Sequence, residues 1–231
     1  MQIPDWQWNE MQQIGTDFTD LGEIEKYDNR MASFRDVDAE NREMLDTLNL
    51  PVGSAILDIG CGTGRFVRAA AEAGMAATAV DVSPGMLQYV RRKAEEDGLP
   101  TIVTQHAGFL TMSFPAATFD AAISGAVLHH LPDAWKLKAL LNTAYVLKPG
   151  GQFILRDVVF TPGSDADPEV CFKRFAESIP AVMRTEAARH VAREFSTFDW
   201  IMQGLLKRAG FEILSTTQPL DDFLVYHCRK P

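Results

Sequence analysis

Short runs of apolar residues alternate with amphipathic stretches through the middle of the chain. Each apolar run has the length and composition of a buried β-strand. The runs lie at 55–59, 76–81, 101–105, 119–124 and 152–159. The stretches between them carry apolar residues at helical spacing, at 64–73, 84–97 and 133–147. This alternation predicts repeated βα units and a mostly parallel, doubly wound sheet of the α/β class.

The predicted helices end where helix-stopping residues stand. Gly74 and Gly98 follow the first two helices, and the turn Lys-Pro-Gly-Gly at 148–151 follows the third. A further helix at 198–209 begins with a Ser196-x-x-Asp capping pattern. Two strands are predicted after it, at 212–217 and 223–228.

Two regions fall outside this alternation and divide the single domain into parts. Residues 1–50 are polar and helix-compatible, and we expect helices there that cover the open face of the sheet. Residues 160–197 begin with a loop rich in Pro, Gly and Asp and continue as a basic amphipathic helical segment, which we expect to act as a lid. The α/β core then covers 51–159, and 198–231 hold the final helix and strands.

Composition indicates an ordinary soluble globular protein. The chain has 231 residues, 46% of them hydrophobic and 23% charged, which is enough for one sizeable core. Its net charge of -9 disfavours nucleic acid as a partner, because phosphate binding draws on clustered Lys and Arg. The three widely spaced cysteines fit neither a disulfide framework nor a zinc cluster. With no signal peptide and no membrane-spanning run in the sequence, we expect a cytoplasmic protein without a membrane partner.

The first predicted strand runs into a glycine-rich loop, at the edge of the sheet where α/β proteins bind their ligands. Gly60, Gly62 and Gly64 alternate there, which removes side chains where the turn passes close to a ligand. The helix that follows points its free amides and positive dipole end at the same place. Asp58, before the first glycine, suits a ligand with a cationic ammonium group.

The details of this region distinguish between adenosine-containing ligands. A dinucleotide fingerprint needs Gly or Ala three positions after its second glycine, where this chain has Arg65 or Val67, so a nicotinamide cofactor is disfavoured. Asp81 ends the second strand, where an acidic side chain accepts hydrogen bonds from both hydroxyls of an adenosine ribose. The alternative is that Asp81 is a solvated or helix-capping carboxylate beside Ser83.

Four successive motifs resemble those of class I S-adenosylmethionine-dependent methyltransferases. They read Ile-Leu-Asp-Ile-Gly-Cys-Gly-Thr-Gly at 56–64, Val-Asp-Val-Ser-Pro-Gly-Met-Leu at 80–87, Leu-His-His-Leu-Pro-Asp at 128–133 and Leu-Lys-Pro-Gly-Gly at 147–151. The resemblance is close over 51–159 and loose over the final strands. It implies a Rossmann-like fold of seven strands with the last one antiparallel, S-adenosylmethionine as cofactor and S-adenosylhomocysteine as product.

The resemblance also implies cofactor contacts residue by residue. The loop residues assigned to the methionine portion are Asp58, Gly60, Cys61, Gly62 and Gly64. Asp81 is assigned to the ribose and Val82 to one face of the adenine. Gly125, at the end of the fourth strand, would pass near the sulfonium, and Tyr27 would reach the methionine end.

One motif departs from the family pattern. After the third strand, related sequences often carry an Asp whose carboxylate meets the adenine amino group, but this chain reads His-Ala-Gly-Phe-Leu at 106–110. The backbone of Gly108 and Phe109 is left to meet the adenine, with the Phe109 ring packed nearby.

Two residues are candidates for chemistry beyond cofactor binding. A neutral imidazole at His129 can accept a proton at physiological pH, but the same His-His-Leu-Pro pattern occurs in related sequences with different acceptors, which favours a structural role. Asp157 ends the fifth strand beside Arg156, where acceptor contact and a structural ion pair both stay open. Cys61 needs no role as a nucleophile in so tight a turn. No carboxylate cluster is spaced for a metal, so no metal is expected.

These features predict a methyltransferase that holds a small-molecule nucleophile in line with the methyl group. Basic residues of the N-terminal segment and the lid predict a positive rim and an anionic acceptor. They are Arg30, Arg35, Arg184, Arg189 and Arg193. One alternative is a non-catalytic S-adenosylmethionine-binding module that serves a protein partner. Another is aminopropyl transfer, which would need an acidic cleft rather than a basic lid.

Overall fold

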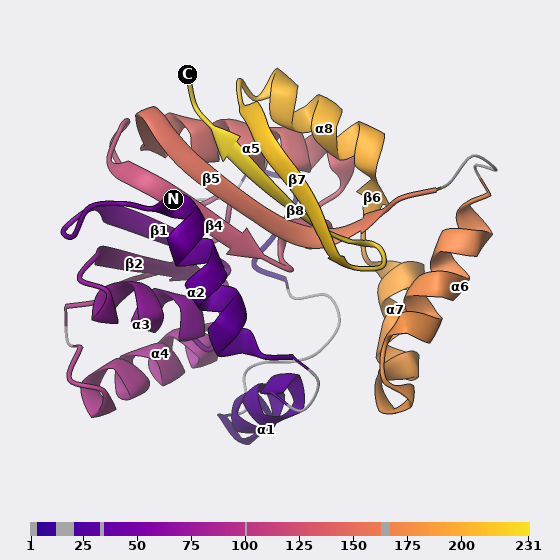
Figure 1. The fold of residues 1–231 in the computed structure, drawn as a ribbon, viewed down its shortest axis with the longest axis horizontal. Helices are drawn as coiled ribbons and strands as arrows, with labels where there is room; N and C mark the ends of the chain where they lie inside the picture. The colour runs from indigo at the N-terminus through magenta and orange to yellow at the C-terminus, as the bar shows by residue number, and fades with distance from the viewer. Residues whose placement is uncertain (1–3, 13–20, 33–34, 100, 163–166) are drawn as a thin grey trace.

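A twisted sheet lies between two layers of helices in the computed structural model of the chain (Figure 1). The structure describes residues 4–12, 21–32, 35–99, 101–162 and 167–231. Its strands are β1 (Ala55–Ile59), β2 (Ala76–Asp81), β3 (Val103–His106), β4 (Phe119–Gly125), β5 (Leu147–Phe160), β6 (Thr197–Phe198), β7 (Glu212–Leu220) and β8 (Phe223–Arg229).

The strand order in the sheet is β3-β2-β1-β4-β5-β8-β7, with the short β6 paired to β5 outside this row. The strands from β3 to β5 pair in parallel, whereas β8 runs antiparallel to both of its neighbours. The predicted doubly wound sheet with an antiparallel last strand is therefore confirmed. The winding reverses between β1 and β4, which is where such sheets bind ligands.

Helices cover both faces of the sheet. Those on one face are α2 (Val37–Leu48), α3 (Arg65–Glu72) and α4 (Pro84–Glu96), and those on the other are α5 (Asp133–Val146) and α8 (Asp199–Arg208) (Figure 1). Successive strand residues point to opposite faces. Ile56 accordingly packs in a buried cluster with Val67 and Val90, while Leu57 packs in the other cluster with Leu140.

The N-terminal region contributes both to the core and to a cover. Leu48 of α2 is buried in the same cluster as Ile56 of β1. The preceding helix α1 (Leu21–Ala32) lies beside α4, where Ile24 is buried with Met86 and Tyr89. The predicted cover is thus divided into a core helix, α2, and a more peripheral helix, α1.

The predicted insertion after β5 forms a lobe at one end of the sheet (Figure 1). It consists of α6 (Pro168–Ser178), the 3-10 helix η2 (Ala181–Met183) and α7 (Arg184–Arg193). Cys171 and Phe175 of α6 are buried together with Phe160 at the end of β5, so an apolar cluster fastens the lobe to the sheet. Residues 163–166 of the predicted loop lie outside the described part of the chain.

The start of α8 differs from the predicted capping pattern. Phe198 is its N-cap residue, and no side chain caps the helix. The Ser196 hydroxyl instead lies 2.6 Å from Nε2 of His190, and Asp199 accepts a hydrogen bond of 2.7 Å from the Tyr226 hydroxyl. Ser196 and Asp199 therefore bond to residues of other elements and do not cap α8.

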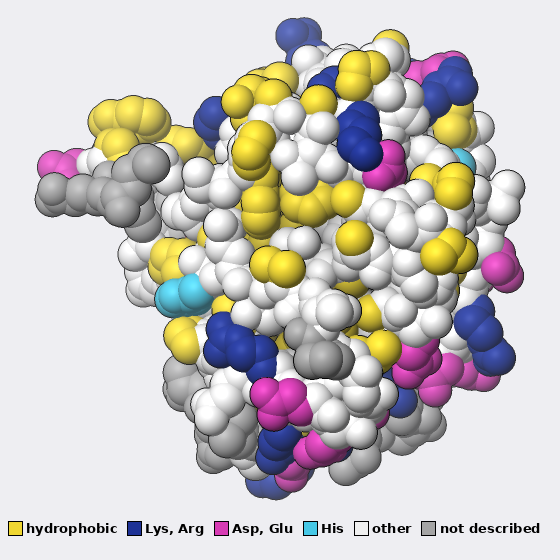
Figure 2. Space-filling view, turned by 90° about the vertical axis from the view of Figure 1, so that its left-hand side faces the viewer, with side chains coloured by type: hydrophobic (Ala, Val, Ile, Leu, Met, Phe, Trp, Pro, Cys, Tyr) yellow, Lys and Arg dark blue, Asp and Glu magenta, His cyan; other side chains and the backbone are white. Residues whose placement is uncertain are grey.

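The surface has a mixed character on the side drawn in Figure 2. Acidic and basic side chains stand near one another there, with hydrophobic side chains between them, so neither sign of charge dominates this face. Within the described ranges, every helix is too short or too polar to cross a membrane.

Candidate active site

A cavity of about 410 Å³ opens at the carboxyl ends of the central strands. Its walls come from the loops that follow β1, β2, β3 and β4, and from the N-terminal segment and the lobe. The residues of the predicted site that line it are Tyr27, Gly60, Gly62, Asp81, Val82, Gly108, Phe109, Gly125 and His129. The fold therefore brings segments that are far apart in the sequence to one cavity.

The three loop glycines have positive φ angles of 74°, 52° and 75° in chain order, which favour glycine over other residues. A Cβ at Gly60 would lie 2.3 Å from the Val127 side chain, and one at Gly64 would lie 2.6 Å from Val90. A Cβ at Gly62 would meet no atom within 4 Å. Gly60 and Gly64 thus allow close packing, whereas Gly62 borders open space in the cavity.

Asp81 is nearly buried, and backbone amides hold its carboxylate in place. Its Oδ2 accepts a hydrogen bond of 2.9 Å from the Gly62 amide, and its Oδ1 accepts one of 2.8 Å from the Ser83 amide. Burial raises the pKa of Asp81 above its ordinary value, although these hydrogen bonds oppose the shift. Ser83 itself caps α4 through the Met86 amide, so Asp81 is not the helix cap.

Three residues assigned to cofactor contact, Asp58, Cys61 and Gly64, are not among the described residues that line the cavity. Asp58 is buried at the end of β1, where burial and the negative charge of Asp81 raise its pKa to about 7. Burial and the negative charges of Asp81 and Asp58 hold the pKa of the Cys61 thiol well above its usual value. A thiolate nucleophile at Cys61 is therefore disfavoured.

Glu10 is a buried residue of the cavity that sequence reasoning missed. Its Oε1 accepts hydrogen bonds of 2.8 Å from both the Leu110 amide and the Thr111 hydroxyl. A Cβ at Gly108 would lie only 2.4 Å from Oε2 of Glu10, so the carboxylate fills the space that a side chain at this position would take. No local pattern links Glu10 to a loop so distant in the sequence.

Other contacts hold the N-terminal segment over the cavity. Tyr27 and Trp8 both line it. Asp28 ties α1 to the glycine loop, because it accepts a hydrogen bond of 2.6 Å from the Thr63 hydroxyl. The Trp8 ring stands edge-on to Phe195, which follows α7, at 5.4 Å between ring centroids. The N-terminal segment therefore contacts the chain just after the lobe, next to the cavity.

The predicted positive rim is only partly assembled. Arg35 and Arg156 line the cavity, and each lies 2.6 Å from the Glu40 carboxylate. The side chain of Arg30 lies outside the described residues. The arginines of α7 are exposed and do not belong to the described lining; they are Arg184, Arg189 and Arg193.

His129 lies in the 3-10 helix η1 (Leu128–His130) after β4, buried between two carboxylates. Its Nδ1 is 2.5 Å from Oδ1 of Asp157, and its Nε2 is 3.2 Å from Oε2 of Glu194. Burial alone would lower the pKa of His129, but the two negative charges raise it to about 9. Such an imidazolium cannot accept a further proton at neutral pH. Asp157 contacts His129 and lies inside β5 rather than at its end.

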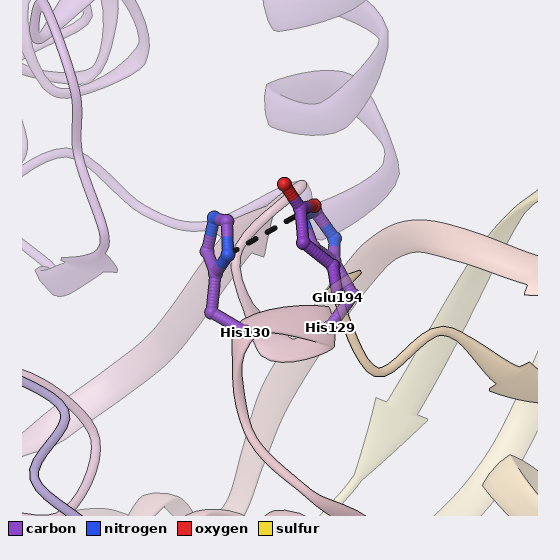
Figure 3. Close-up of side chains that lie close together, drawn as sticks. All are labelled: His129, His130 and Glu194. Atoms are coloured by element: carbon purple, nitrogen blue, oxygen red, sulfur yellow. Dashed lines mark ion pairs between the residues drawn. The ribbon is translucent and has the colours of Figure 1, made fainter. Parts of the chain in front are cut away.

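Two further histidines flank Glu194, which sequence reasoning also missed although it stands four residues after His190. His190 Nδ1 lies 2.5 Å and His130 Nδ1 lies 4.0 Å from Oε2 of Glu194; Figure 3 shows the latter pair. Burial and the charge of His129 lower the pKa of His130 to about 4. Its buried Nδ1 makes no hydrogen bond within the described residues.

A second space of about 370 Å³ lies next to the cavity, beside the lobe. The two spaces share four apolar residues, which are Phe175, Ile179, Leu220 and Phe223. The lining of the second space is completed by Ser178, Pro180 and Asp221, so it is largely apolar with one carboxylate.

A glycine loop at the switch point of the sheet and an acid at the end of β2 define an enzyme class that binds an adenosine-containing cofactor on a Rossmann-like fold. A family model described as a methyltransferase domain matches residues 56–151. The chain belongs to the class I S-adenosylmethionine-dependent methyltransferases, and S-adenosylmethionine is the cofactor of that family.

Known proteins resemble the chain over different shares of their lengths. An S-adenosyl-L-methionine-dependent Diels-Alderase of Talaromyces variabilis is 32% identical, over 79% of this chain and 61% of its own. A methyltransferase of Geobacillus kaustophilus is 29% identical, over 86% and 90%. The aklanonic acid methyltransferase DauC of Streptomyces is 33% identical, over 53% and 56%. A solved structure from Pyrococcus horikoshii has a TM-score of 0.68 at 20% identity, over 93% and 95%.

Proposed function

We propose that this protein transfers a methyl group from S-adenosylmethionine to a small-molecule acceptor. The neighbouring position of the two spaces, which share four lining residues, carries the proposal. Asp81 and the glycine loop border one end, the apolar chamber under the lobe forms the other, and Gly125 and His129 lie in the lining between them. A cofactor at one end and an acceptor at the other would therefore lie next to each other.

The described residues fit the cofactor. A Cβ at Gly62 or Gly125 would meet no atom within 4 Å, so open space is available for the methionine portion and the sulfonium. The fixed carboxylate of Asp81 would accept hydrogen bonds from the ribose hydroxyls. Val82 and Phe109 would pack against the adenine.

Glu10 would supply the carboxylate that related sequences often carry as an Asp after β3 and that this chain lacks there. Its carboxylate lines the cavity beside Gly108, in the space that a side chain at that position would occupy. A carboxylate there can accept a hydrogen bond from the adenine amino group. Burial raises the pKa of Glu10, while hydrogen bonds from Leu110 and Thr111 favour its ionised form.

The acceptor would be mainly apolar. The chamber under the lobe takes most of its lining from Phe175, Ile179, Leu220 and Phe223, which suit a hydrophobic or aromatic skeleton, and Asp221 adds one carboxylate. Arg35 and Arg156 share the single carboxylate of Glu40, which leaves one wall of the cavity with a net positive charge. This wall would suit an anionic group on the acceptor.

When bound, the cofactor supplies a methyl group on a cationic sulfur, which is open to in-line displacement. The chain contributes position and exclusion of water, which together lower the barrier to such a reaction. Trp8, which lines the cavity and packs edge-on against Phe195, contributes to this exclusion of water. His129 is held as a cation because carboxylates engage both of its ring nitrogens, so it cannot remove a proton from the acceptor.

The test is turnover of the cofactor. The full chain is incubated with S-adenosylmethionine and a panel of phenols, carboxylic acids and apolar metabolites, and S-adenosylhomocysteine is measured by chromatography. We expect it to form only with accepted substrates, each gaining the mass of one methylene group. Tight cofactor binding without S-adenosylhomocysteine from any compound or extract fraction would contradict the proposal.

A second candidate is a cyclisation in the same chamber, with the cofactor bound but not consumed. The similarity to a Diels-Alderase and the largely apolar lining of the second space favour it. The same assay separates the two functions, because a cyclised product has the mass of its substrate and forms without S-adenosylhomocysteine.

A further inference from the structure

Three side chains on one wall of the cavity bring metal-binding atoms together. His129 Nε2 lies 3.2 Å from Oε2 of Glu194, His130 Nδ1 lies 4.0 Å from the same oxygen, and the three donor atoms lie within 4.8 Å of one another. Figure 3 shows the His130 ring and the Glu194 carboxylate facing each other across the gap. We propose that these three residues bind a zinc ion.

The ligand set is one that zinc uses in catalytic sites. Two imidazoles and one carboxylate hold the ion there, and the fourth position takes water or substrate. With metal–ligand distances of about 2.0–2.2 Å, tetrahedral donors lie roughly 3.3 Å apart. His129 and Glu194 already have this spacing. The His130 side chain is 41% exposed, so its ring has room to turn toward the ion.

Asp157 prepares His129 for this role. A metal-binding histidine usually donates its second ring N–H to a carboxylate, which fixes the tautomer and the orientation of the ring. Asp157 Oδ1 stands 2.5 Å from Nδ1 of His129, and its Oδ2 accepts a hydrogen bond of 3.1 Å from the His129 amide. Nε2 is thereby directed away from β5 and toward Glu194.

The other two ligands also have suitable surroundings. The buried Nδ1 of His130 makes no hydrogen bond among the described residues, and a bound ion would satisfy it. His190 Nδ1 lies 2.5 Å from Oε2 of Glu194 and orients the carboxylate, while Ser196 in turn lies 2.6 Å from Nε2 of His190. All three proposed ligands line the cavity, so the fourth position of the ion would open toward the acceptor.

The chemical role rests on the proposed methyl transfer. An acceptor hydroxyl bound at the fourth position would lose its proton to solvent water, because a zinc ion strongly lowers the pKa of a bound oxygen acid. The resulting oxyanion would attack the methyl carbon. The new O–C bond would form as the S–C bond breaks, and neutral S-adenosylhomocysteine would leave. Zinc would replace the proton on Nε2 of His129, because a metal-binding imidazole is neutral. This route removes the acceptor proton without using His129 as a base.

The experiment measures zinc binding by the full chain with no acceptor present, so its failure is distinct from a failure of methyl transfer. Chelator-treated protein is dialysed against Zn²⁺, and the bound metal is quantified by atomic emission. Co²⁺ is the second probe, because its visible absorption reports the coordination geometry. We expect one zinc ion per chain, retained through gel filtration, and a tetrahedral Co²⁺ spectrum.

Variants identify the ligands. His130→Gln and Glu194→Gln should each weaken zinc binding at least tenfold and change the Co²⁺ spectrum, and Asp157→Asn should weaken it roughly 10- to 100-fold. His227→Gln is the matched control, because His227 bonds to Gln152 on the sheet, outside this cluster. Thermal melting in chelator checks that each variant is folded.

Two results would overturn the proposal. One is that the wild-type chain retains no zinc. The other is that folded His130→Gln and Glu194→Gln bind zinc as tightly as the wild type and the His227→Gln control do.

Discussion

Asp81 holds its carboxylate between the amides of Gly62 and Ser83, within the lining of the cavity. Hydrogen bonds to a charged group contribute roughly 1.5–3 kcal/mol each. Asp81→Ala should therefore weaken binding of S-adenosylhomocysteine by about tenfold to a thousandfold, as measured by calorimetry. Asp97→Ala, at the partly exposed end of α4, is the control and should leave the affinity unchanged. An unchanged affinity in Asp81→Ala would remove Asp81 from the site.

Glu10 and Gly108 offer a test by exchange. Glu10→Ala should weaken binding of S-adenosylhomocysteine by about tenfold, because one charge-assisted hydrogen bond to the adenine is lost. Gly108→Asp alone should displace the Glu10 carboxylate from its hydrogen bonds and weaken binding, since its Cβ would lie 2.4 Å from Glu10 Oε2. In the double variant the collision is absent and a carboxylate returns, so affinity should recover to within about threefold of wild type. A double variant as weak as Glu10→Ala would refute this role.

Asp58 should make cofactor binding depend on pH. Burial and Asp81 raise its pKa to about 7, above its ordinary value of 3.8, so ionisation of Asp58 destabilises the cofactor-free fold as pH rises through this range. A bound ammonium group would favour the ionised form and offset that loss. The increase in Tm caused by S-adenosylhomocysteine should therefore grow from about pH 6 to about pH 8. Asp58→Asn should flatten this dependence, and an unchanged profile in that variant would exclude Asp58 as its source.

At the scale of the elements, strands buried on both faces were the most predictable part of the fold. β1 and β2 have the predicted bounds, because buried parallel strands are continuous apolar runs. β5 begins earlier than predicted, in the segment 147–151 that carries the Lys-Pro-Gly-Gly turn pattern. Leu147 still pairs with Phe119, and the register then shifts before Gln152 pairs with Ala121. The neighbouring strand β4, which local sequence does not reveal, therefore determines where β5 starts.

Prediction of the residues that line the cavity has the same limit, because local sequence does not reveal tertiary contacts. Gly62 and Asp81 lie in motifs whose spacing can be read along the chain, and both line the cavity. Glu10 and Glu194 reach it from the N-terminal segment and the end of α7, so only tertiary packing brings them there. The predicted cap of α8 was wrong for a related reason. Ser196 and Asp199, the two side chains of the predicted pattern, bond instead to His190 and Tyr226.

The helix α2 belongs to the core rather than to a removable cover. Leu48 is 2% exposed and packs in the cluster that includes β1. Leu48→Ala should lower the free energy of unfolding by about 2–5 kcal/mol, which denaturant titration would measure. Val52→Ala, at a residue 81% exposed, is the control and should change it by less than about 0.5 kcal/mol. Equal effects of the two changes would show that α2 does not contribute to the core.

At the scale of the whole molecule, the cavity is bordered by segments from different parts of the chain. Residues 4–12 and α7 both contribute lining residues, and Trp8 contacts Phe195 just after α7, so a bound ligand should slow the motions of both segments. We expect S-adenosylhomocysteine to reduce amide hydrogen exchange in residues 4–12 and in α7, with α8 as the unaffected control. Protection confined to the glycine loop would mean that these two segments do not respond to the cofactor.

The antiparallel placement of β8 affects how the protein is made. Gln152 at one end of the β5 pairing meets Arg229, and Val158 at the other meets Phe223. During synthesis β5 therefore emerges long before its partner, with one edge of an apolar strand unpaired. The ribosome must deliver the lobe, α8 and β7 before that edge is covered. Nascent chains stalled after β5 should consequently depend on chaperones, whereas chains that include β8 should not.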